Sequence, residues 1–108
     1  MKLTIRARHL DLEPAQAAQL RRRVHAALDR LAAAIRAVEV TIVDVNGPKG
    51  GPDQQCRVRI RGREVGTIVI EQLGVDPLAT VALAVDRAAR ATVRALARRR
   101  RFGPALAT

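Results

Sequence analysis

The period of the hydrophobic pattern changes along this chain, and that change constrains the fold more than any other feature. Apolar and polar residues alternate in four short segments, as they do in strands with one buried face: residues 2–7, 38–45, 55–61 and 64–71. Two longer segments, 14–35 and 77–101, repeat apolar residues at spacings of three and four, which is typical of amphipathic helices. The sequence therefore predicts the order β-α-β-β-β-α.

Prolines and capping residues mark the predicted helix ends. Glu13-Pro14 starts the first helix, and Asp76-Pro77 starts the second with an N-cap and a proline at the first position. Gly103-Pro104 is expected to end the second helix, which leaves 103–108 as a short tail. Two helices on one face of a four-stranded sheet form a two-layer α+β sandwich, so we expect a single domain over residues 1–102.

The end of segment 38–45 and the residues after it do not continue the alternating pattern. The alternation of segment 38–45 slips at Val43, which indicates either a bulge or the end of the strand. Residues 46–53, with the sequence NGPKGGPD, are expected to form a turn-rich loop. Lys49 in this loop is a candidate contact with phosphate.

Basic residues outnumber acidic ones by twenty to ten, which gives a net charge of +10 at pH 7. Only Lys2 and Lys49 are lysines, so eighteen of the twenty basic residues are arginines. A chain this basic attracts polyanions, and the forked guanidinium suits bidentate contact with phosphate. A GC-rich genome would also favour arginine, and the heavy use of alanine agrees with that alternative. Composition alone therefore favours a polyanionic partner only in part.

The second predicted helix separates its arginines from its apolar residues. With about 100° per residue and Val85 at zero, the apolar side lies within about 60° and comprises Leu78, Val81, Ala88, Ala89, Thr92 and Leu96. An arginine stripe lies between about 140° and 220° and comprises Arg87, Arg90, Arg94, Arg98 and Arg101. Only Asp86 supplies an acid near this row. The stripe predicts contact with an extended anion, against the alternative of a solvated helix face.

Other elements add basic residues that could extend this surface. The first helix carries Arg21, Arg22, Arg23, His25 and Arg30. If both helices cover the same face of the sheet, a basic groove can form between them, which is a suitable shape for a phosphate backbone. Arg22 and Arg23 are the candidate RNA contacts on the first helix. The arginines of segment 55–61 are expected on the opposite face of the sheet. There, a second contact surface and a solvated face are both open.

The chain offers no aromatic platform, because Phe102 is its only aromatic residue. Proteins that bind single strands usually stack bases on rings, so we expect contact with the backbone of folded RNA instead. Catalysis is not expected, because the single cysteine, Cys56, lies on the apolar side of a strand, which predicts a buried inert thiol. His9 and His25 lack a Cys or carboxylate at ligand spacing, so neither a metal nor a cofactor is expected.

The apolar segments are too short to span a membrane or to form a signal peptide. Lying on a membrane surface is also disfavoured, because the apolar side of the second helix is mostly Ala and Val and is needed for the core. A cytoplasmic protein is expected, with no small-molecule substrate.

The order of elements and three segments give the chain a resemblance to the ribosome hibernation promoting factor family, also called ribosome-associated inhibitor A or sigma-54 modulation proteins. The segments are MKLTIRARHLDL, EPAQAAQL and DPLATVALAVDRAARATVRALARRR. Family members open the last helix with Asp-x-Tyr-Ala-Ala-Ile-Asp. Asp76, Ala79 and Val81 fit that frame, whereas Leu78 replaces the tyrosine and Ala82 replaces the second aspartate.

The resemblance implies the β-α-β-β-β-α fold and a translation inhibitor that holds the ribosome idle. It implies binding to ribosomal RNA of the small subunit, in the channel used by messenger and transfer RNA. Arg87, Arg90, Arg94 and Arg23 would contact that RNA by carry-over, in a short form without the C-terminal dimerising domain of longer members. The alternatives are a regulatory module that binds an acidic protein partner and a small enzyme that uses Cys56.

Overall fold

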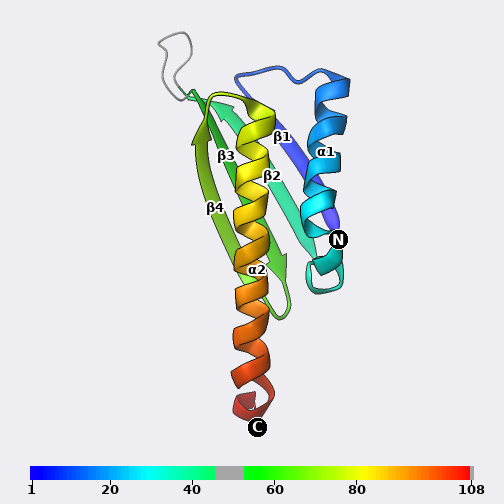
Figure 1. Ribbon diagram of the computed structural model, residues 1–108, viewed down its shortest axis with the longest axis vertical. Coiled ribbons are helices and arrows are strands. Elements are labelled where there is room, and N and C mark those ends of the chain that lie inside the picture. The colour runs from blue at the N-terminus through cyan, green and yellow to red at the C-terminus, as the bar shows by residue number, and fades with distance from the viewer. Residues whose placement is uncertain (46–52, 108) are drawn as a thin grey trace.

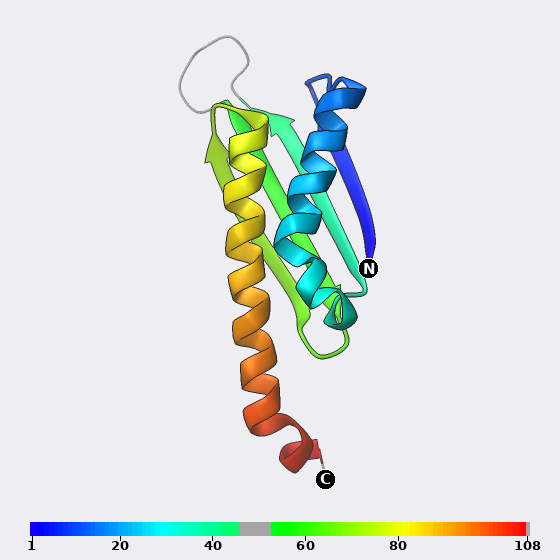
Figure 2. The same ribbon diagram turned by 45° about the vertical axis from the view of Figure 1, so that its right-hand side comes forward.

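Four strands and two long helices follow one another in the predicted order. The computed structural model describes residues 1–45 and 53–107, and Figure 1 shows its elements. These are β1 (Lys2–Arg8), α1 (Pro14–Leu28), the 3-10 helix η1 (Asp29–Ala34), β2 (Ala37–Asp44), β3 (Gln54–Gly62), β4 (Gly66–Gly74) and α2 (Pro77–Ala107). Both views show α1 and α2 on the same face of the sheet, so the predicted two-layer α+β architecture is confirmed (Figures 1 and 2).

The four strands form one sheet in the order β1-β2-β3-β4. β1 pairs with β2 in parallel, which requires a crossover, and α1 supplies it. The other two pairs are antiparallel. The β2–β3 register places apolar residues opposite one another on the helix side, where all of them are buried: Val38 with Ile60, Val40 with Val58, and Ile42 with Cys56.

The core between the sheet and the helices is aliphatic, as the composition predicts. α1 contributes Leu20, Val24 and Leu28, and α2 contributes Val81 and Val85, all almost fully inaccessible. Burial of each such side chain stabilises the fold by about 1.5–3 kcal/mol before entropic costs. One face of each element is therefore committed to the core, and its opposite face is left for partners.

The first helix is shorter than predicted. α1 ends at Leu28 rather than near Ile35, and η1 follows it. A 3-10 helix repeats every three residues, so the apolar spacing from Leu28 to Leu31 persists without an α-helix. Ile35 is buried although its backbone is already extended. The apolar pattern therefore predicts which side chains face the core, but it does not distinguish an α-helix from a 3-10 helix.

The second helix is longer than predicted, because α2 runs through Gly103 and Pro104 to Ala107. A proline inside a helix removes one backbone hydrogen bond and bends the helix. Figure 2 shows the last turns of α2 leaving the axis of the rest. The prediction that Gly103-Pro104 ends the helix is therefore wrong.

Strand ends also differ from the predicted ones. β2 pairs with β3 without interruption from Ala37 to Asp44, so the slip at Val43 marks the approach of the strand's end rather than a bulge. β4 begins at Gly66 instead of Glu64. Val65 packs into the core from the β3–β4 turn, and Gly66 adopts a φ of 70°, which suits glycine.

Candidate nucleic-acid interface

The two sides of α2 are segregated in the structure. Val81, Val85, Ala88, Ala89 and Thr92 are buried, and the Thr92 hydroxyl donates to the Ala88 carbonyl, which satisfies the one polar group among them. The stripe residues whose side chains the structure describes are exposed: Arg87, Arg90, Arg94 and Arg98. Arg101 lies in α2, but its side chain is outside the described set. The predicted separation of arginines from the core is confirmed for the other four.

Arg87, the first residue of the arginine stripe, contacts the sheet. Its Nη1 donates to the Glu71 carbonyl oxygen at 2.8 Å and to Gln72 Oε1 at 2.9 Å, both on the edge strand β4. Arg90 and Arg94 follow at spacings that place them on the same side of a helix. Arg87 is therefore the stripe residue that contacts the β4 edge, while the stripe as a whole lies on the side of α2 opposite the core. Because both acceptors are uncharged, Arg87 keeps its full positive charge there.

Asp86, the neighbour of Arg87 in sequence, faces the other way, toward α1. Arg23 Nη2 lies 2.7 Å from Asp86 Oδ2, with the two side chains 33% and 41% exposed. This charge-assisted hydrogen bond ties α1 to α2. Arg23 is thus neutralised by a partner 63 residues away, a pairing for which the sequence offers no local signal.

A shallow hollow lies between the first turns of α2 and the facing part of α1. Arg22 and Arg23, the candidate contacts on α1, line it, and Asp76 lines it as well. The remaining lining residues are mostly small or apolar: Gln19, Ala26, Leu78, Ala79 and Ala82. Within the part of the chain that the structure describes, no arginine of the stripe lines this hollow. This hollow therefore does not bring the two groups of candidate residues together.

Asp76 shapes this end of α2 as an N-cap. The Ala79 amide donates to Asp76 Oδ2 at 2.8 Å, and the Thr80 hydroxyl donates to the Asp76 carbonyl at 2.6 Å. At the start of α1, the Glu13 amide donates to Gln16 Oε1 at 2.9 Å in a capping box. These caps fix where each helix starts and hence the register of its arginines. Lys49, the candidate loop contact, lies outside the described residues.

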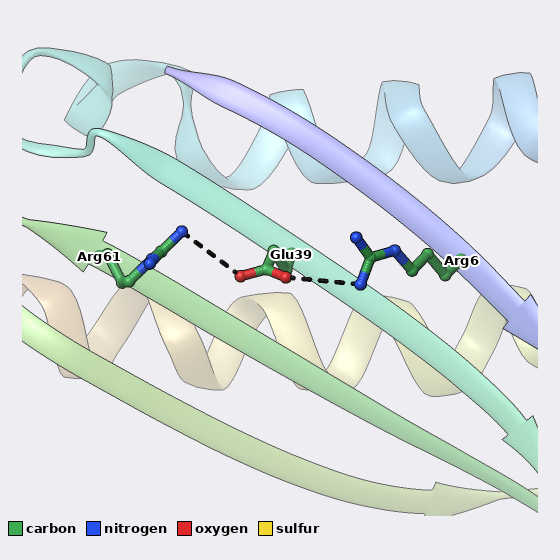
Figure 3. A network of polar contacts seen from close by, with 3 residues as sticks. All are labelled: Arg6, Glu39 and Arg61. Atoms are coloured by element: carbon green, nitrogen blue, oxygen red, sulfur yellow. Dashed lines mark ion pairs between the residues drawn. The ribbon is translucent and has the colours of Figure 1, made fainter.

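The face of the sheet turned away from the helices is also basic. Arg57, Arg59 and Arg61 are exposed on it, as the alternation of β3 predicts. Figure 3 shows part of this face: Glu39 of β2 bridges Arg6 and Arg61, with N···O distances of 3.8 and 3.6 Å. A hollow on this face is lined by Arg6, Arg8, Glu39, Thr41, Val43, Gln55, Arg57, Arg59 and Glu71.

Most of the chain matches a known protein family. Residues 3–100 match the family described as Sigma 54 modulation protein / S30EA ribosomal protein. The chain belongs to this family. The S30EA match covers the sheet except Lys2, all of α1 and most of α2, and it confirms the resemblance carried by the sequence motifs.

Solved structures support the same fold for this S30EA-family chain. The N-terminal domain of Protein Y from Thermus thermophilus is 19% identical, with a TM-score of 0.68 over 87% of this chain and 98% of that one. A ribosomal subunit interface protein from Coxiella burnetii is 14% identical, with a TM-score of 0.71 over 90% and 99%. No curated protein matches the chain by sequence. At these identities the likeness concerns the fold alone.

Cys56 is buried, as predicted from its place on the apolar side of β3. Burial raises the pKa of its thiol to about 12 by desolvation. The nucleophilic thiolate is therefore scarce at neutral pH, which argues against the enzyme alternative.

The prediction that His25 has no carboxylate at ligand spacing is wrong. Asp29 Oδ1 lies 2.7 Å from His25 Nδ1, although no carboxylate was expected at ligand spacing from His25. The spacing of four residues along a helix could have revealed this pair. Among residues 1–45 and 53–107, no group of three or more His, Cys, Asp or Glu is arranged to hold a metal ion. No helix in the same part of the chain is long and apolar enough to cross a membrane.

Proposed function

We propose that this chain is a ribosome hibernation factor. In this proposal it binds ribosomal RNA of the small subunit, in the channel used by messenger and transfer RNA, and inhibits translation while it is bound. The family match supports association with the ribosome. The role is one of occupancy and needs neither a cofactor nor a small-molecule substrate.

The observation that carries the proposal is the exposed arginine stripe on α2. Among the described residues, none places a carboxylate within ion-pair distance of Arg90, Arg94 or Arg98. Guanidinium groups at these spacings repel one another, and the phosphates of an RNA backbone would relieve that repulsion and release counterions. Contacts of this kind position a protein without reading base sequence.

The direct test is sedimentation with purified small subunits at low salt. We expect the wild-type chain to co-sediment and to leave the pellet as salt rises, because phosphate contacts are salt-dependent. Arg90→Glu with Arg94→Glu should weaken binding by about tenfold or more. A matched control, Arg21→Glu with Arg30→Glu, makes the same charge change on α1 and η1 and should retain most of the binding.

A translation assay completes the test. The wild-type chain should inhibit protein synthesis in a purified system, and the Arg90/Arg94 variant should not. Failure of the wild-type chain to co-sediment at low salt would overturn the proposal. A pull-down dominated by one acidic protein and unchanged by nuclease would instead favour a regulatory module that binds that protein.

A further inference from the structure

We infer that the sheet face turned away from the helices is a second RNA-binding surface, which takes the phosphodiester backbone of a different RNA segment from the one at the arginine stripe. The inference rests on the proposed function and deepens it: the chain would lie between two RNA segments, with one against each layer of the sandwich.

Arginines form a regular row on the open face of the sheet. Arg57, Arg59 and Arg61 occupy alternate positions of the central strand β3 and are all exposed. Alternate residues of a strand lie on one face, about 6.6 Å apart. These three side chains therefore form a straight row along the middle of the open face.

Two hollows adjoin this row. The first lies over the strands and includes Arg8, Arg57 and Arg59 in its lining. The second lies at the β3–β4 hairpin end and is lined by Arg36, Arg61, Gly62, Arg63, Gly66 and Thr67. We call the arginines of both hollows, Arg6 excepted, the sheet-face track: Arg8, Arg57, Arg59, Arg61, Arg36 and Arg63. Because Arg59 and Arg61 are alternate residues of β3, the hollows continue one another.

The acids on this face do not balance the track. Glu39 is shared between Arg6 and Arg61 at 3.8 and 3.6 Å, so one carboxylate serves two guanidinium groups (Figure 3). Glu71 lies opposite Arg57 in the register but accepts a hydrogen bond from Gln55 Nε2, at 3.4 Å. In the part of the chain that the structure describes, Arg57 and Arg59 are within ion-pair distance of no acid.

The shape of the track favours a nucleic-acid backbone over a compact anion. A row of guanidinium groups on a strand presents forked donors to successive phosphates. The described part of this face carries no aromatic side chain, so bases have nothing to stack on, and contact through the backbone is the mode that remains. The helices cover the opposite face of the sheet, so the track and the arginine stripe lie on different layers of the sandwich.

The experiment compares three double variants that each remove two positive charges from exposed positions. The sheet variant is Arg57→Gln with Arg59→Gln, the helix variant is Arg90→Gln with Arg94→Gln, and the control is Arg21→Gln with Arg30→Gln. Circular dichroism melts check that each variant folds. Affinity for small subunits is measured against salt concentration, and the number of short RNA duplexes bound per chain is measured by titration at low salt.

We expect the salt slope for small subunits to fall by about 1.4 to 1.8 in the sheet variant and similarly in the helix variant, since each loses about two phosphate contacts. The control should keep the wild-type slope. The wild-type chain should bind two RNA duplexes, and the sheet and helix variants should each bind one.

A sheet variant with the wild-type slope and two bound duplexes overturns the inference and leaves the proposed function standing. A wild-type chain that binds two duplexes but no small subunit supports the second surface and refutes the proposed function. Displacement of the duplex from the sheet face by polyglutamate, as effective per charge as displacement by RNA, would assign the face to an acidic protein and overturn the inference.

Discussion

The buried thiol of Cys56 makes a quantitative prediction about stability at alkaline pH. The folded chain holds this thiol with a pKa of about 12, against 9.0 for an accessible cysteine. The folded state therefore keeps its proton where the unfolded state releases it. Stability from this group is fully present below about pH 9 and is lost as pH rises toward 12.

The size of the effect follows from the linkage between proton binding and unfolding. Between the two pKa values the free energy of unfolding should fall by about 1.4 kcal/mol per pH unit at most. From pH 9 to pH 11 the loss should be about 2 kcal/mol, given a folded pKa of about 12. The chain has no tyrosine and only two lysines, so few other side chains ionise in this window.

Urea denaturation at a series of pH values measures the loss, with Cys56→Ala as the reference. The variant should be less stable at every pH, because it leaves a small cavity in the core. Its stability should change less between pH 9 and pH 11, by the same 2 kcal/mol or so. Parallel curves for wild type and variant would refute the reasoning. Rapid labelling of the native thiol by a disulfide reagent at pH 8 would also refute it, because an accessible thiol should react about a thousand times faster.

Two further predictions concern how α2 is held. A double-mutant cycle with Arg23→Gln and Asp86→Asn should give a coupling free energy of about 0.5–1 kcal/mol, because the pair is short but partly exposed, and high salt should reduce it. Zero coupling in urea denaturation at low salt would show that the pair does not tie the helices. Gly74→Ala should destabilise the chain by about 1–3 kcal/mol, since a Cβ there would clash with the Thr80 hydroxyl, which donates to the carbonyl of the N-cap Asp76. An unchanged melting temperature would show that the start of α2 yields easily.

The sequence predicts the fold well where burial alone decides. Alternation in β3 assigns Cys56, Val58 and Ile60 to the core and the arginines to the open face, and the structure agrees. Sequence-based prediction fails where the same apolar spacing is compatible with more than one backbone conformation. Leu28, Leu31 and Ile35 follow one another at helical spacings of three and four, although they lie in an α-helix, a 3-10 helix and extended chain, so periodicity does not locate the end of α1.

The sequence predicts which arginines of the candidate site are exposed, but not which residues from other elements they contact. A helical wheel identifies the exposed side of α2, because exposure depends on local geometry. It does not reveal that Arg87 reaches β4 or that Arg23 reaches Asp86, since both contacts join elements far apart in the chain. The expected groove with arginines from both helices depended on those tertiary contacts. In the structure Arg87 instead contacts the β4 edge, and Arg23 is paired with Asp86.

These contacts show that the arginines implied by the family resemblance differ in how free each one is to bind phosphate. Arg23 forms an ion pair with Asp86, so its attraction for phosphate is reduced. Part of its role is to join the two helices. Arg87 is held in place by uncharged acceptors and keeps its charge, which prepares it for contact with an anion at little further loss of side-chain entropy. Arg90 and Arg94 are free of described acids and exposed. Phosphate affinity should therefore depend on Arg90 and Arg94 first, on Arg87 next and on Arg23 least.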